Sequence, residues 1–136
     1  MLVHRWERGE LWLWRAGRNV IVVKHVGYAE GACVAFLAEA FDTVSEGEHD
    51  LDVFIDCQEQ TGFDMAFRDR VADWARSVQP RVRSVCALVR SRIVGFGVAV
   101  VSVLIGRITT MVATEEAFAR KLAAAVRGSL EDDDAA

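Results

Sequence analysis

The stretch LDVFIDCQEQTGFDMAFRDRVADW, residues 51–74, decides the fold that is predicted for this chain. Its first part, residues 51–55, is a short apolar run that predicts a buried strand, and a polar turn is expected over residues 58–62. Beyond the turn, apolar residues recur every three or four positions, which predicts one amphipathic helix. These residues are Phe63, Phe67, Val71, Trp74 and Val78. A strand, a turn and a helix N-terminus together form a common ligand or regulatory site on an α/β sheet.

Upstream of this stretch, the sequence predicts a β-hairpin followed by a helix. Residues 10–15 and 20–26 are rich in aromatic and β-branched side chains, and a short turn joins them. Residues 30–44 carry apolar side chains at helical spacing, and Gly47 follows the expected end of that helix. Residues 1–9 are left outside the domain as an N-terminal extension.

Downstream, Pro80 is expected to end the central helix, because proline and the residue before it disfavour helical backbone. The remaining segments again alternate between strand and helix, and an acidic tail that is expected to be flexible follows them. They are a strand over 82–89, an uncharged helix over 93–106, a strand over 108–113, a helix over 114–128 and the tail over 129–136.

The predicted order is β-β-α-β-α-β-α-β-α, in a single α/β domain over residues 10–128. Strands that alternate with helices are joined by crossover connections, which favour parallel pairing. We therefore expect a mostly parallel five-stranded sheet with an N-terminal β-hairpin and four helices.

Composition and charge narrow the class of protein. The chain has 136 residues, which suit one domain, and 52% hydrophobic residues, which exclude wholesale disorder. Its formal net charge is −4, so it has no basic excess for binding nucleic acid. The uncharged segment 93–106 is shorter than the about 20 residues that a membrane span needs. With three widely spaced cysteines and no visible signal peptide, the expected location is the cytoplasm.

No catalytic, metal-binding or cofactor-binding motif is found. His4, His25 and His49 lie far apart in the sequence, and none has a cysteine or histidine at metal-ligand spacing. No serine lies in a Gly-x-Ser-x-Gly elbow, and no phosphate-binding loop occurs. The chain is therefore predicted to be neither an enzyme nor a cofactor-dependent protein.

The predicted turn supplies the candidate regulatory site, which comprises Asp56, Cys57, Thr61 and Gly62. Thr61 is expected to cap the following helix, with phosphorylation or anion binding as the functional alternative. Asp56 is either a site carboxylate or an acceptor for the amides of the turn. Cys57 is either a buried, inert thiol or a thiol activated by the helix N-terminus.

The helix predicted over 93–106 offers only Ser102 as a polar side chain, whereas a helix on a sheet normally has a polar outer face. Either a neighbouring element covers that face, or the face binds a partner protein or a second copy. Glycines there would let another backbone approach closely. The candidate interaction surface comprises Gly95, Gly97, Val100, Val101 and Leu104.

Three segments carry a resemblance to a known family. They are VFID and TGF within residues 53–63, LVRS at 88–91 before the uncharged helix, and EEAF at 115–118. Together with the order of the elements over residues 10–127, they resemble the STAS domain, and in particular the SpoIIAA-like (STAS/SEC14-type) proteins.

In anti-sigma-factor antagonists of this family, the corresponding strand ends in Asp-Ser followed by a glycine, and a kinase phosphorylates the serine. Here the pair is Asp56-Cys57, and the nearest hydroxyl before a glycine belongs to Thr61. The resemblance implies a non-enzymatic bacterial regulatory or signalling module that binds another protein, or itself as a homodimer. Its link to SEC14-type proteins implies an alternative, an apolar small molecule or lipid held between the uncharged helix and the sheet.

Overall fold

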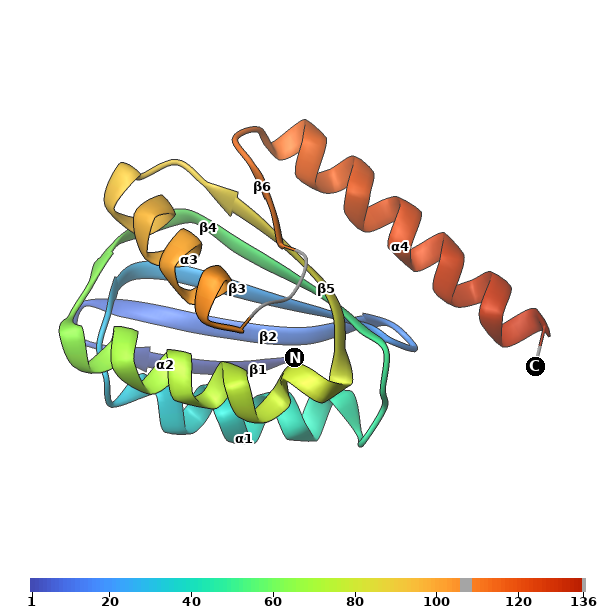
Figure 1. Ribbon diagram of the computed structural model, residues 1–136, viewed down its shortest axis with the longest axis horizontal. Helices are drawn as coiled ribbons and strands as arrows, with labels where there is room; N and C mark the ends of the chain where they lie inside the picture. The colour runs from blue at the N-terminus through green and yellow to red at the C-terminus, as the bar shows by residue number, and fades with distance from the viewer. Residues whose placement is uncertain (106–108, 136) are drawn as a thin grey trace.

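The computed structural model describes residues 1–105 and 109–135, with side chains for residues 1–102 and 110–130. In this part of the chain, four α-helices pack on one six-stranded mixed sheet whose strands follow chain order (Figure 1). The strands are β1 (Leu2–Trp6), β2 (Gly9–Gly17), β3 (Val20–Ala29), β4 (Leu51–Phe63), β5 (Val82–Val89) and β6 (Thr109–Val112). The helices are α1 (Cys33–Ser45), α2 (Met65–Val78), α3 (Arg92–Ile105) and α4 (Glu115–Ala135), and a short 3₁₀-helix η1 (Gln79–Arg81) leads from α2 to β5.

The N-terminal part of the sheet has three antiparallel strands, β1, β2 and β3, rather than the predicted hairpin of two. The sheet therefore has six strands, and the prediction of five is wrong. Residues 2–6, predicted to lie outside the domain, form the edge strand β1. Leu2 and Trp6 pack against the main core, and the Trp6 indole N–H donates to the carbonyl of Tyr28 at 2.9 Å. Five residues are too few to show a clear period, so the pairing with β2 decides their conformation.

The remaining strands, β3 to β6, pair in parallel, as the alternation of strands and helices predicts. The strands follow one another across the sheet in chain order. The crossover connections between parallel strands are right-handed, so successive crossovers that advance in the same direction place their helices on the same face. The connecting helices α1, α2 and α3 therefore lie on one face of the sheet. The last helix, α4, packs on the opposite face (Figure 1).

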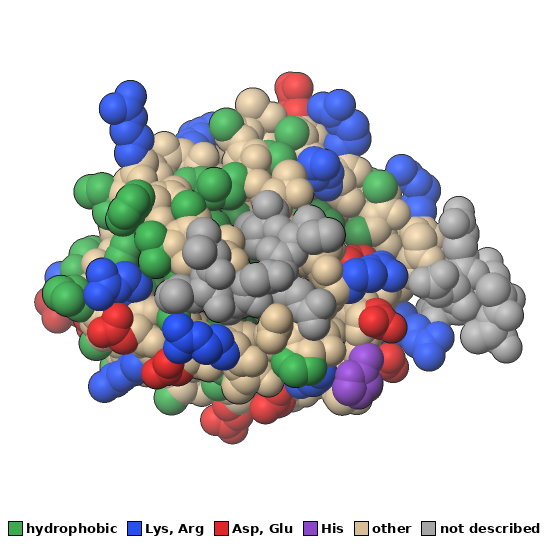
Figure 2. Space-filling view, viewed as in Figure 1, with side chains coloured by type: hydrophobic (Ala, Val, Ile, Leu, Met, Phe, Trp, Pro, Cys, Tyr) green, Lys and Arg blue, Asp and Glu red, His purple; other side chains and the backbone are tan. Residues whose placement is uncertain are grey.

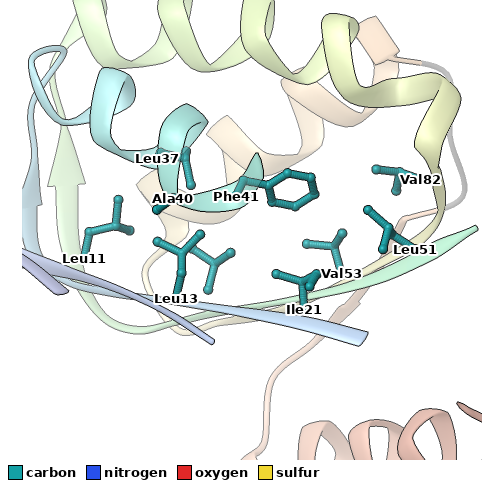
Figure 3. Packing of buried hydrophobic residues seen from close by; sticks show 10 residues of the cluster. Leu11, Leu13, Ile21, Leu37, Ala40, Phe41, Leu51, Val53 and Val82 are labelled. Carbon is teal, nitrogen blue, oxygen red and sulfur yellow. The ribbon is translucent and has the colours of Figure 1, made fainter. Parts of the chain in front are cut away.

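Helices cover both faces of β3, and its successive side chains point to opposite sides of the sheet, so all of them at the start of the strand are buried. Ile21 and Val23 face α1 and α2, whereas Val20 and Val22 face α4. This two-sided burial explains the unbroken apolar run at the start of the strand. The core on the α1 side includes Leu11, Leu13, Ile21, Leu37, Ala40, Phe41, Leu51, Val53 and Val82 (Figure 3).

The predicted turn over residues 58–62 is wrong, because β4 continues as a strand to Phe63. Its pairing with β3 extends to Phe63 opposite Ala29, across two irregularities of register. The backbone N–H and C=O groups of these polar residues therefore find hydrogen-bond partners in the sheet. The polar side chains themselves give no sign of this pairing.

Asp64, and not Thr61, caps the helix that follows. The Asp64 carboxylate accepts a hydrogen bond from the Phe67 amide at 2.7 Å and another from the Gly31 amide at 3.1 Å. Thr61 is an exposed residue within β4, so the predicted capping box is wrong. The carboxylate thus joins the start of α2 to the turn before α1.

The uncharged segment forms helix α3, which confirms its prediction as a helix. Residues 106 and 108, the predicted end of this helix and start of the next strand, lie outside the described residues. Helix α4 does not end at Gly128 as predicted, since it continues to Ala135 and includes most of the expected tail. A single helical glycine costs only about 1 kcal/mol, which does not suffice to end a helix.

We expect Asp64→Ala to lower the free energy of unfolding by about 2 kcal/mol, because it removes a helix cap and leaves the Gly31 amide without its acceptor. The matched control Thr61→Ala is expected to change it by less than about 0.5 kcal/mol, since Thr61 is exposed. Urea denaturation followed by circular dichroism measures both. Equal losses in the two variants would contradict the assignment of Asp64 as the cap.

Candidate functional site

A cavity of about 150 Å³ lies between the sheet, α2 and α3. Strand β4 forms its floor with Val53, Ile55 and Cys57, and its walls are almost entirely aliphatic or aromatic. The walls include Phe67, Val71 and Trp74 from α2 and Val94, Val98 and Val101 from α3. The cavity is suited to an apolar molecule, because ligand pockets are typically apolar with a few placed polar groups.

Helix α3 approaches the sheet closely at Gly97, which is buried. A Cβ atom at this position would lie 2.7 Å from Cζ of Phe63, the last residue of β4. A Cβ atom at Gly95 would lie 3.2 Å from a methyl carbon of Val89. Both glycines therefore pack within their own domain, and Gly97 is not available for the close approach of another backbone.

His25, on β3, is the polar side chain that distinguishes this cavity. It is only 7% exposed, and its ring lies nearly perpendicular to that of Phe67, with 5.8 Å between the centroids. Its Nδ1 has no hydrogen-bond partner among the described residues. A buried polar atom without a partner costs about 1–3 kcal/mol, and less than 1 Å² of the surface of this nitrogen is accessible.

Burial lowers the pKa of His25 from 6.5 to about 4, because the apolar surroundings disfavour the cationic ring. The imidazole is therefore neutral at neutral pH, with one nitrogen as a donor and the other as an acceptor. The sequence pattern draws attention to His25 only as a possible metal ligand and does not indicate its place in the cavity. The available indication was its alternation with Ile21 and Val23 on the inward side of β3.

The other polar groups in the cavity are neutral or already engaged. The Gln60 amide donates to the carbonyl of Gly62 at 3.3 Å, and the Ser102 hydroxyl donates to the carbonyl of Val98 at 2.7 Å. Burial raises the pKa of the Cys57 thiol to about 12, which favours its interpretation as an inert thiol. Arg68, which also borders the cavity, forms an ion pair with Asp69 at 3.2 Å.

The structure does not gather the predicted regulatory residues into one site. Asp56 and Cys57 are neighbours on a strand, so their side chains leave it on opposite sides, with Cys57 in the cavity. The Asp56 carboxylate accepts from the Gln58 amide at 3.0 Å, which is the local bond expected of a structural aspartate. Thr61 is exposed, and Gly62 is buried next to the ring of Tyr28.

The residues predicted as an interaction surface divide between two sides of α3. Val101 lines the cavity. The outer side exposes Ile93 and Phe96, which were not among the predicted residues and are 65% and 74% exposed. Val100 follows them at helical spacing, and the side chain of Leu104 lies outside the described residues. Figure 2 shows hydrophobic side chains gathered over this side of α3 and the start of α2, where Met65 is also exposed.

The arrangement of the sheet and helices is similar to that of a solved structure. This is the crystal structure of an uncharacterised protein from the DUF3478 family of Shewanella loihica PV-4, described as having a SpoIIAA-like fold. The match has a TM-score of 0.66 and covers 90% of this chain and 99% of that one, at 10% sequence identity. The chain has a SpoIIAA-like fold. The fold type predicted from the order of elements is thereby confirmed, with six strands in place of five.

At this level of identity the likeness concerns the SpoIIAA-like fold alone. No protein-family model matches the sequence, and no curated protein matches it. Among the described residues, no group of histidine, cysteine and acidic side chains could hold a metal ion. None of the helices, over the same residues, combines the length and apolar character needed to cross a membrane.

The depressed pKa of His25 predicts a pH dependence of stability. Between pH 6.5 and about 4 the unfolded chain protonates this histidine and the folded chain does not. The free energy of unfolding should therefore fall as the pH is lowered through this range, by about 3 kcal/mol from this residue. Urea denaturation of the wild type and of His25→Phe at several pH values gives the free energy of unfolding of each. The difference between the two proteins isolates the contribution of His25 protonation. A difference that stays constant over the range would contradict a buried, neutral ring.

Proposed function

We propose that the protein is a non-enzymatic module of SpoIIAA-like fold that binds a small apolar molecule between α2, α3 and the sheet. The observation that carries this proposal is the cavity of about 150 Å³, with its almost entirely apolar walls. Protein interiors contain few voids larger than a water molecule. Apolar walls left in contact with water are unfavourable by about 25 cal/mol per Å², and an apolar ligand that covers them recovers part of that free energy.

The side chains around the cavity support binding rather than catalysis. The Cys57 thiol is held neutral by its burial, so the nucleophilic thiolate is scarce. Desolvation is the one cause of the shifted His25 pKa, and no carboxylate among the described residues orients the ring. A nucleophile paired with an oriented base is therefore lacking in this part of the chain. The free, buried cysteines Cys33, Cys57 and Cys86 support the cytoplasm as the location.

Two neighbouring valines of α3 provide a matched test of the cavity. Val101 lines it, whereas Val100 does not. We expect Val101→Phe to fill part of the cavity and weaken binding of the natural ligand at least about tenfold, while Val100→Phe leaves binding unchanged. Native mass spectrometry of freshly purified proteins should show an added mass in the wild type and Val100→Phe, and little in Val101→Phe.

A wild-type protein that carries no added mass, and takes up none from a cell extract, would contradict the proposed function. Retention of the same mass by both variants would place the ligand elsewhere. Circular dichroism of each variant confirms that the fold persists.

A second candidate function is contact with another protein, in the simplest case a second copy of the chain as a homodimer. The observation that favours it is the outer side of α3, where Ile93 and Phe96 are exposed without a charged residue beyond Arg92. Large exposed apolar side chains that cluster commonly mark a contact site. The same helix would then line the ligand and meet the partner, so one element would connect the two binding events.

We expect Phe96→Asp to convert a homodimer to a monomer, because it places a carboxylate in the centre of this apolar surface. The matched control is Leu130→Asp on α4, which changes a residue of similar exposure that lies away from α3. Sedimentation velocity over a range of protein concentrations measures the oligomeric state. A wild type that remains monomeric at every concentration, or a dimer that survives Phe96→Asp, would count against self-association through α3.

A further inference from the structure

We propose that the outer side of α3 and the start of α2 form a docking surface for anionic membranes. This docking surface comprises Met65, Arg90, Arg92, Ile93 and Phe96, all of them exposed. The contact would be peripheral, with the side chains reaching the headgroups and the edge of the acyl region and no part of the chain crossing the bilayer. The inference goes beyond the proposed function, because it needs no ligand in the cavity.

The apolar part of the docking surface consists of three large side chains. Met65, Ile93 and Phe96 are 68%, 65% and 74% exposed. Ile93 and Phe96 are three positions apart, so they lie on the same side of α3. Figure 2 shows Lys and Arg side chains beside the hydrophobic ones at this end of the molecule. Apolar side chains in such a position stabilise an interfacial contact by leaving water for the boundary between headgroups and acyl chains.

The basic part follows from an uneven distribution of charge along the sequence. Residues 74–114 contain six arginines and no aspartate or glutamate, although the whole chain has a formal net charge of −4. Three of these arginines form ion pairs with aspartates, which are Arg76 with Asp73, Arg81 with Asp42 and Arg83 with Asp52. Within the part of the chain whose side chains are described, the arginines of this segment that remain uncompensated are Arg90 and Arg92.

Arg90 and Arg92 lie where β5 ends and α3 begins, next to the exposed apolar side chains. Neither forms an ion pair or a hydrogen bond through its side chain among the described residues. The nearby acidic residues at the start of α2 are already engaged, since Asp64 caps the helix and Asp69 pairs with Arg68. Exposed apolar side chains beside uncompensated cations match a membrane that contains anionic lipids.

The same charges disfavour a second copy of the chain as the occupant. In a two-fold dimer through this surface, the arginines of one copy would lie near those of the other. Residues 74–114 offer no carboxylate to offset that repulsion. Anionic lipids can move to meet Arg90 and Arg92, while the long side chains keep their charged ends among the headgroups and Phe96 reaches the apolar boundary.

The test measures sedimentation of the full-length protein with lipid vesicles. One set of vesicles contains phosphatidylcholine alone, and the other contains phosphatidylcholine with about 30% phosphatidylserine as the anionic lipid. We expect the wild type to bind the anionic vesicles at least about tenfold more tightly than the neutral ones. This preference should decrease when the salt concentration is raised from about 0.1 M to about 0.5 M, because salt screens the attraction.

A pair of double variants tests the arginines. We expect Arg90→Gln/Arg92→Gln to weaken binding to the anionic vesicles about thirtyfold, since each basic residue near such a surface contributes a factor of about five. The matched control is Arg120→Gln/Arg127→Gln, which removes the same charge from exposed positions of α4 on the opposite face of the sheet. The control should bind as the wild type does.

A pair of single variants tests the apolar part. We expect Phe96→Ala to weaken binding about tenfold by removing apolar surface from the contact. The matched control Leu130→Ala changes a side chain of α4 that is 59% exposed and should leave binding unchanged. Circular dichroism checks the fold of every variant, and the comparison of vesicles and salt concentrations with the wild type needs no variant.

The outcomes separate this inference from the proposed function. No binding of the wild type to anionic vesicles, equal binding to both kinds of vesicle, or equal losses in the α3 and α4 variants would overturn the docking surface and keep the cavity. A dimer that forms through α3 without vesicle binding would overturn it in favour of a second copy. Vesicle binding by a wild type that carries and takes up no ligand would support the docking surface and remove the proposed function.

Discussion

The close approach of α3 to the end of β4 is the contact on which the proposed site depends. It is possible only because Gly97 has no side chain where it meets the ring of Phe63. Since α2 begins directly after that residue, capped by Asp64, the two helices come together at one end of the cavity. Farther along, Val98 and Val101 on α3 and Trp74 on α2 form walls around a space that neither helix fills. The cavity is thus a consequence of a contact made at its edge.

Helix α3 has two apolar sides with different surroundings, which relates the two candidate functions. Val94 and Val101 face the cavity, and Ile93 and Phe96 face outward. A molecule in the cavity and a protein on the outer side would therefore act on the same element, and each could influence the affinity of the other.

Much of the architecture could be predicted because it depends on local patterns. The alternation of helices and strands, the helical state of α3 and the single domain follow from periodicity and length. The errors arise where pairing between distant segments overrides composition. Residues 2–6 are held by β2, and the polar end of β4 is held by β3, so neither can be recognised from its own side chains. At the site, the sequence predicts Val101 and Cys57 as candidate residues, and both line the cavity, whereas it gives no indication that His25 does.

The sequence by itself determined which segments are helix or strand and which helix lacks charge, because these properties repeat over a few residues. Only the tertiary structure decided which side of α3 faces the sheet and where the packing leaves space. It also decided the chemical state of His25, since an imidazole is ordinary in water and becomes a neutral, unpartnered group only when distant apolar residues exclude the solvent. Desolvation depends on the whole fold, and no local pattern encodes it.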